Sequence, residues 1–344
     1  MNIYYPRNHQ LHHPQTEFFN GEMIPHSEVP SRLENILSAL EGSAHTLLAV
    51  DRVTDFAAIW HELSQIHSPE YLVWLWNTQV LQAVYPSVFS ATGVLEKTWH
   101  QSIQWGRFVT DIFTPLLPHT WEVATTTAQC IFMATNECLQ NRTSSLVLAR
   151  PPGHHAGRSR AGGYCYLNNA AFAAQILSKS GRVAILDVDF HHGNGTQDIF
   201  YDRDDVVTCS IHADPRRKFP YFAGYEAELG VGNGVGYNRN FPLAAGITDT
   251  QYQPLLEEAL AWIAQFEPKF LIVSLGLDTH ESDPIADFAL TTGYYQTMAK
   301  TISGLGLPQI TVLEGGYSTT SIGENMVSFL GGARSIGAKK PGRR

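Results

Sequence analysis

The residues best suited to chemistry lie in one short stretch, 185–195, which reads I-L-D-V-D-F-H-H-G-N-G. The apolar run before its first carboxylate is typical of a strand buried inside a parallel sheet. Asp187, Asp189 and His191 alternate along the chain, so on an extended backbone their side chains leave the same face. Two carboxylates and an imidazole are costly to bury without partners, and a divalent cation between them would relieve that cost. Because carboxylate oxygen and imidazole nitrogen together suit zinc or a similar transition metal, we predict a metal site here.

Three further polar motifs each follow an apolar segment. They are R-P-P-G-H-H at 150–155, S-L-G-L-D at 274–278 and E-G-G-Y at 314–317. Each motif alone is a weak indication, since an aspartate after a strand is usually a cap and Gly-Gly-Tyr is often a turn. Ligands of open α/β sheets sit beyond the carboxyl ends of the strands. We therefore expect the four motifs to share one site, with Asp278 as a third metal ligand.

The elements that must position these motifs alternate between strand and helix patterns. We expect strands over 146–149, 183–190, 206–211, 270–276 and 309–314, and helices over 31–40, 70–84, 120–139, 168–181, 252–266, 294–303 and 321–330. This order predicts an α/β fold, a doubly wound and mostly parallel sheet with helices on both faces. We expect a single domain over 1–344 that ends in a short basic tail, 334–344. The first thirty residues are expected to be irregular, and 86–118 a long loop that is either a rim of the site or a loosely packed insertion.

Composition excludes several classes of protein. The chain has 344 residues, 44% of them hydrophobic, and a net charge of −9, which argues against a nucleic-acid surface. Four cysteines without a C-x-x-C pair indicate reduced thiols. Neither a signal peptide nor a membrane-spanning run is recognisable, so we expect a cytoplasmic protein without membrane partners, with export to a host cell left open.

The motifs also resemble those of a known family. R-P-P-G-H-H, G-G-Y-C-Y-L-N-N, D-V-D-F-H-H-G-N-G-T, S-L-G-L-D and E-G-G-Y are similar to the zinc-dependent histone deacetylase superfamily, also called the arginase–deacetylase fold. The resemblance spans roughly 1–330 and, within the superfamily, is closest to bacterial acetylpolyamine amidohydrolases. It implies zinc, or Fe²⁺ in its place, bound by Asp189, His191 and Asp278, tandem catalytic histidines His154 and His155, and a carbonyl-polarising Tyr317.

The same resemblance implies further binding residues. A structural potassium ion would be held by Asp187, Ser210 and Ile211 together with backbone carbonyls of Asp189 and His191. A second monovalent site would use Phe200, Arg203, Val206 and Tyr237. The acyl-lysine tunnel would be walled by Tyr164 and Phe222, with Gly163 beside them.

Physical roles can be assigned to these residues. Two carboxylates and one imidazole neutralise a divalent metal, so its water should be less acidic than at an all-histidine site and a general base is needed. We expect His155 to be that base, with Asn194 as a neutral partner that leaves its pKa close to working pH, and His154 to be held charged or strongly polarised by Asp187. Tyr317 would stabilise the developing oxyanion. The predicted reaction is hydrolysis of an N-acetyl amide with release of acetate.

The substrate is less clearly indicated. The stretch 97–110 contains no carboxylate that could read a polyamine's second cation; it carries His100, Gln101, Gln104, Trp105 and Arg107. The main expectation is therefore acetyl-lysine in a protein or peptide, and the alternative is a small acetylated polyamine, with a homodimer possible in either case. A two-metal ureohydrolase would need a second set of Asp and His ligands, and a non-catalytic acyl-lysine binder would be expected to lack Tyr317 or a ligand.

Overall fold

The computed structural model describes residues 1–19, 21–89 and 100–333. Its centre is an eight-stranded sheet with the order β4-β1-β5-β10-β9-β6-β7-β8, and every strand pairing described in it is parallel. The strands are β1 (Asn2–Pro6), β4 (Thr46–Val50), β5 (Ser145–Val147), β6 (Val183–Asp187), β7 (Val206–Ala213), β8 (Asn238–Leu243), β9 (Phe270–Leu275) and β10 (Gln309–Leu313). A separate antiparallel hairpin is formed by β2 (Thr16–Phe19) and β3 (Glu22–Pro25).

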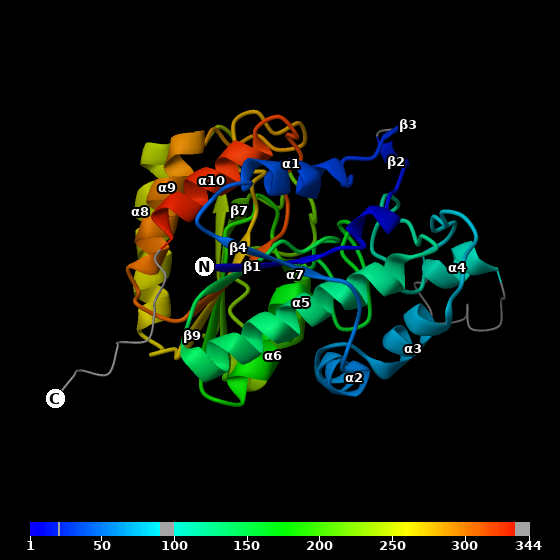
Figure 1. Ribbon diagram of the computed structural model, residues 1–344, viewed down its shortest axis with the longest axis horizontal. Helices are drawn as coiled ribbons and strands as arrows, with labels where there is room; N and C mark the ends of the chain where they lie inside the picture. Colours follow the sequence, from blue (N-terminus) through cyan, green and yellow to red (C-terminus); the bar gives the residue numbers. More distant parts are fainter. Residues whose placement is uncertain (20, 90–99, 334–344) are drawn as a thin grey trace.

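Helices cover both faces of the sheet (Figure 1). One face packs α2 (Phe56–Ile66), α5 (Thr120–Asn141) and α6 (Asn169–Ser178), and the other packs α1 (Ser31–Ala39), α8 (Asp249–Ala264), α9 (Thr292–Ser303) and α10 (Ile322–Gly332). Successive residues of β6 point to opposite faces of the sheet and so alternate between two hydrophobic cores. Val183 and Ile185 pack in the core under α5 and α6, and Ala184 and Leu186 pack in the core under α8 and α9. The predicted doubly wound α/β fold is thereby confirmed.

Local sequence explains where several helices begin. The Asn168 side chain accepts a hydrogen bond from the Ala171 backbone nitrogen at 2.8 Å and so caps α6. Thr248 and Gln251 form a reciprocal capping box at the start of α8. The spacing of Ser31 and Glu34 is typical of a capping box, but none is formed, because α1 begins after Pro30 without a side-chain cap.

The structure differs from the sequence-based expectation in the N-terminal third. The first thirty residues are not irregular: β1 lies inside the sheet, between β4 and β5. Strands β4 and β8 and helices α2 and α7 (Asn194–Phe200) were not expected either, and the predicted 70–84 helix ends early, as α3 (Pro69–Asn77). Within 86–118, the short helix α4 (Gln101–Trp105) is described, whereas 90–99 lies outside the described residues, as does the expected basic tail 334–344.

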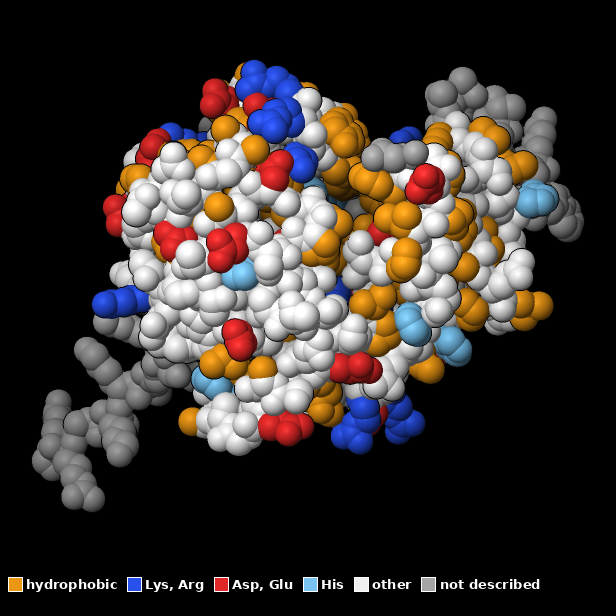
Figure 2. Space-filling model, turned by 90° about the horizontal axis from the view of Figure 1, so that it is seen from above, with side chains coloured by type: hydrophobic (Ala, Val, Ile, Leu, Met, Phe, Trp, Pro, Cys, Tyr) orange, Lys and Arg blue, Asp and Glu red, His pale blue; other side chains and the backbone are white. Residues whose placement is uncertain are grey.

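Two general features concern the surface. None of the helices in the described ranges is long and apolar enough to cross a membrane. Seen from above, the molecule has a hollow with hydrophobic side chains gathered on both sides of it (Figure 2).

Candidate active site

The metal-ligating stretch begins where β6 ends. Strand β6 stops at Asp187, earlier than the predicted position 190. Asp187 Oδ1 then accepts a hydrogen bond from the Asp189 nitrogen at 3.1 Å, and Asp189 Oδ1 accepts one from the His191 nitrogen at 2.8 Å. The expectation of one extended face is therefore wrong for Asp189 and His191, which are placed by two successive side-chain turns.

These turns bring the predicted metal ligands together. Donor atoms of Asp189, His191 and Asp278 all lie within 4.8 Å of one another, with both aspartates fully buried. His191 Nδ1 is 3.2 Å from Asp278 Oδ2 and 3.6 Å from Asp189 Oδ1. Burial and the Asp189 carboxylate raise the pKa of Asp278 to about 7, a cost that a cation between the groups would relieve. The donor set thus fits a divalent metal such as zinc.

Gly315 shows how tightly this cluster is enclosed. Its nitrogen donates to Asp189 Oδ2 at 2.7 Å. A Cβ at this position would lie 2.4 Å from Asp278 Oδ2 and 2.6 Å from Asp189 Oδ2. The first glycine of the E-G-G-Y motif is therefore required by close approach to the ligands.

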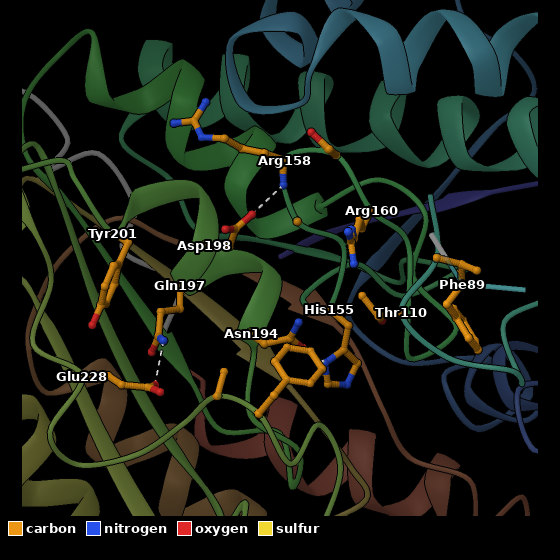
Figure 3. Close-up of a pocket in the computed structure, with 15 residues that line it drawn as sticks. Phe89, Thr110, His155, Arg158, Arg160, Asn194, Gln197, Asp198, Tyr201 and Glu228 are labelled. Carbon is orange, nitrogen blue, oxygen red and sulfur yellow. Dashed lines mark hydrogen bonds between the residues drawn. The ribbon is translucent and has the colours of Figure 1, made fainter. Parts of the chain in front are cut away.

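The tandem histidines have different partners, as predicted. His154 Nδ1 is 3.0 Å from Asp187 Oδ2. His155 Nδ1 is instead 2.7 Å from Asn194 Oδ1, and Figure 3 shows these two side chains next to one another. Burial alone would lower the pKa of His154, but the carboxylates of Asp189 and Asp187 outweigh it and raise this pKa to about 10. Burial and the neighbouring His154 hold the pKa of His155 well below its usual range. These opposite shifts favour a charged His154 and a neutral His155 that can accept a proton, and they put the pKa of His155 below the working pH rather than near it, as the sequence had predicted.

Buried carboxylates that were not predicted hold the histidine loop. Glu314 Oε2 accepts hydrogen bonds from the backbone nitrogens of Gly153 at 2.7 Å and His154 at 3.1 Å. Glu28, fully buried, binds Arg150 at 2.7 Å and Arg32 at 2.9 Å. Glu314 belongs to a motif that the sequence singled out, but Glu28 lies in no recognisable pattern.

Tyr317 lies at the same edge of the sheet. Its nitrogen donates to Asp283 Oδ2 at 2.7 Å, and its ring contacts the Arg32 guanidinium at 4.7 Å and the Tyr164 ring at 5.7 Å. Burial raises the pKa of Tyr317 well above its usual range, so the phenol keeps its proton and can donate a hydrogen bond.

A cavity of about 660 Å³ leads to these groups. Its lining includes Glu17, Phe113, His155, Gly163, Tyr164, His191, Phe219 and Tyr317. Gly163 has a left-handed backbone with φ of 51°, and a Cβ there would lie 2.1 Å from His155 Cδ2. The predicted tunnel residues Tyr164 and Gly163 are therefore in this wall.

Phe222 was predicted to form a wall of the acyl-lysine tunnel, but it does not line this cavity. Phe219 occupies the wall instead, with its ring centroid 4.9 Å from that of His155 and 6.3 Å from that of His191. Phe222 is 59% exposed and lines a neighbouring cleft that reaches His155 from the Asn194 side. The left-handed backbone at Tyr221, with φ of 68°, separates the two phenylalanines, which sequence spacing alone does not reveal.

The rim of the cavity also differs from expectation. Trp105 is fully buried and stacks on Trp74 at 5.6 Å, so it is a core residue. Arg107 pairs with Glu70, and the first residues of the expected 97–110 rim lie outside the described residues. An acidic group is instead supplied by Glu17 of β2.

The monovalent sites remain predictions. Asp187 and Ser210 are register partners in neighbouring strands, with Ile211 next along β7, and Ser210 Oγ is 2.7 Å from His212 Nδ1. For the second site, the structure brings together two of the four residues named. The Arg203 guanidinium lies over the Phe200 ring at 4.9 Å and pairs with Asp205 at 2.6 Å, while Val206 begins β7 and Tyr237 precedes β8.

Comparison with known proteins agrees with this geometry. The histone deacetylase domain model matches residues 26–333. Acetylpolyamine amidohydrolase 1 of Pseudomonas aeruginosa is 40% identical over 95% of this chain and 97% of its own length, and the Mycoplana ramosa acetylpolyamine amidohydrolase is 38% identical over 96% and 99%. The crystal structure of acetylpolyamine aminohydrolase from Burkholderia pseudomallei superposes with a TM-score of 0.87 at 35% identity, covering 96% of this chain and 98% of that one. This chain therefore belongs to the histone deacetylase domain family and is an amidohydrolase of the deacetylase type.

Proposed function

We propose that this enzyme hydrolyses the amide of small acetylated polyamines with a bound divalent metal, expected to be zinc. The relatives named for that activity match nearly the whole chain, so the comparisons favour the alternative expectation over the acetyl-lysine interpretation. That interpretation rested on the lack of a carboxylate in 97–110, and the acidic group of the cavity comes from a different segment.

Glu17 is the observation that carries the proposal. Its side chain is 4% exposed, yet it lines the cavity that leads to the metal ligands. Glu17 Oε2 accepts the Tyr164 hydroxyl at 2.6 Å, and Oε1 accepts the Ser27 nitrogen at 3.1 Å and hydroxyl at 2.8 Å. A carboxylate fixed in a cavity wall attracts a substrate that carries a second, cationic amine.

The catalytic roles follow from the protonation states. A metal held by Asp189, His191 and Asp278 would supply Lewis-acid polarisation of the amide carbonyl. His155, neutral at pH 7, takes a proton from the attacking water and returns it to the leaving amine. Charged His154 and the Tyr317 hydroxyl stabilise the negative charge that develops on the carbonyl oxygen.

The test compares substrates that differ in charge. We expect kcat/KM for N-acetylputrescine to exceed that for an acetyl-lysine peptide by about tenfold or more, equivalent to about 1.4 kcal/mol. Glu17→Gln removes the charge, keeps one acceptor oxygen for Ser27 and offers an amide N–H that the Tyr164 hydroxyl can accept. It should lower kcat/KM for N-acetylputrescine and leave that for N-pentylacetamide, a neutral analogue of similar length, nearly unchanged. A peptide preferred by tenfold, or equal losses on both small substrates, would contradict the proposal.

A further inference from the structure

A second group of possible metal donors lies beside the catalytic ligands. Donor atoms of His154, Cys165 and Glu314 all lie within 4.8 Å of one another, and the three residues are buried. None of them belongs to the Asp189, His191 and Asp278 set. Around a tetrahedral zinc ion, such donors lie about 3.3–3.8 Å apart, so a shift of about 1 Å would close the group onto an ion.

Each member of this group keeps a donor atom available. Glu314 Oε2 is occupied by two backbone nitrogens, but Oε1 is buried and has no hydrogen-bond partner in the part of the chain that the structure describes. His154 uses Nδ1 toward Asp187, so Nε2, which lies 3.8 Å from Asp189 Oδ1, is the nitrogen that an ion could bind after displacing its proton. The Cys165 thiol donates to the Gly163 carbonyl at 3.3 Å, a weak hydrogen bond that a sulfur–metal bond would replace. A buried carboxylate oxygen without a partner is costly, and a cation would satisfy it.

We propose that His154, Cys165 and Glu314 form a second, inhibitory site for a thiophilic divalent ion such as Zn²⁺ or Cd²⁺. One thiolate and one carboxylate neutralise the ion, and two protons, one from the Cys165 thiol and one from His154 Nε2, are released to solvent as the sulfur–metal and nitrogen–metal bonds form. The mixed sulfur, nitrogen and oxygen donor set favours zinc and cadmium over Mg²⁺ or Ca²⁺.

Two features set the affinity and the consequence of binding. Burial raises the pKa of the Cys165 thiol well above its usual range, so the ion must displace a firmly held proton and binds more tightly as pH rises. Gly163 and His155 line the substrate cavity, and Cys165 lies directly behind that wall, so the cavity provides the route of entry. An ion on His154 Nε2 removes the charged imidazole from the reacting carbonyl, and hydrolysis slows.

The experiment counts metal and detects sulfur ligation in the intact enzyme. Protein carrying one zinc per chain is titrated with Cd²⁺ while bound metal, the ultraviolet cadmium–thiolate absorption and turnover are followed together. The catalytic ligands include no sulfur, so metal exchange at that site gives no thiolate band. We expect a second equivalent to bind, the band to appear with it, and turnover to fall on the order of 10²-fold.

Two variants locate the ligation. Cys165→Ser should bind no second equivalent, show no band and keep the rate that it has with one zinc per chain before cadmium is added. Cys209→Ser, which removes a buried thiol in β7, should behave as the wild type does. Glu314→Gln should lower the affinity for the second equivalent of Cd²⁺, but the thiolate band should still appear at high cadmium concentration. The proposal is overturned if wild-type protein binds only one equivalent without a thiolate band, or if Cys165→Ser keeps both the second equivalent and the band.

Discussion

Replacement of Asn194 by aspartate should change the pH dependence of catalysis more than any other single-atom exchange in the site. Asn194 Oδ1 lies 2.7 Å from His155 Nδ1 and gives the base a neutral partner. Asn194→Asp places a carboxylate in the same hydrogen bond without altering side-chain size, and its charge centre then lies about 4 Å from that of the imidazolium. The neighbouring histidine provides the reference, because the carboxylates of Asp189 and of Asp187, the latter at 3.0 Å, raise the pKa of His154 to about 10.

The size of the effect follows from the distance. Unit charges about 4 Å apart interact by about 4 kcal/mol at an effective dielectric constant of about 20. One pKa unit corresponds to about 1.4 kcal/mol, so the upper bound is about 3 units. Asn194 is only 9% exposed, and the cost of burying the new carboxylate offsets part of the gain. We expect the pKa of His155 to rise by about 1–2 units.

The assay is kcat/KM measured against pH. A base with a raised pKa remains protonated to higher pH, so the acid limb of the profile should move upward by the same amount. Asn141→Asp, at the exposed end of α5, adds an equal charge elsewhere and should leave the limb in place. If Asn194→Asp keeps the wild-type acid limb while folded and metal-loaded, His155 is not the base whose protonation limits the reaction.

Four further outcomes are expected. Asp189→Ala should lose both bound metal and activity, and a variant with one metal per chain and normal turnover would remove this residue from the ligand set. Tyr317→Phe should lower kcat by about 10²–10³ with metal content unchanged, as expected for loss of one oxyanion donor, and turnover close to wild type would refute that role. Phe219→Ala should raise KM more than Phe222→Ala does, because Phe219 lies against His155 and Phe222 is exposed; the reverse order would restore Phe222 to the tunnel. Burial lowers the pKa of His67 to about 4, so the stability due to its neutral form is present above about pH 6.5 and is lost, up to about 3 kcal/mol, as pH falls toward 4; denaturant unfolding of His67→Gln should show a smaller loss over that range.

Much of the site could be predicted from the sequence because its polar residues come directly after apolar segments that form strands. Apolar segments ending in D-V-D-F-H-H, S-L-G-L-D and E-G-G-Y mark carboxyl ends of parallel strands, and such ends meet at one edge of a sheet. The residue pattern grouped Asp187, Asp189, His191 and Asp278, and the resemblance to the family reduced the predicted metal ligands to three of them, whose donor atoms the structure brings together. The two different histidine partners that were expected also lie beside the histidines. Periodicity was less informative at β1, whose five residues N-I-Y-Y-P carry no clear pattern and become a strand because β4 and β5 lie on either side.

What only the tertiary structure decided depends on contacts between distant segments. Glu314 binds Gly153 across 161 positions, and Glu17 binds Tyr164 across 147, and no local pattern encodes either pair. The choice of Phe219 over Phe222 depends on where the backbone turns after β7. Residue types and their spacing specify which donor groups lie at the end of a strand. The wall of a cavity is instead determined by packing between loops. In a loop the direction of a side chain depends on backbone dihedral angles, and short-range sequence preferences do not fix these angles.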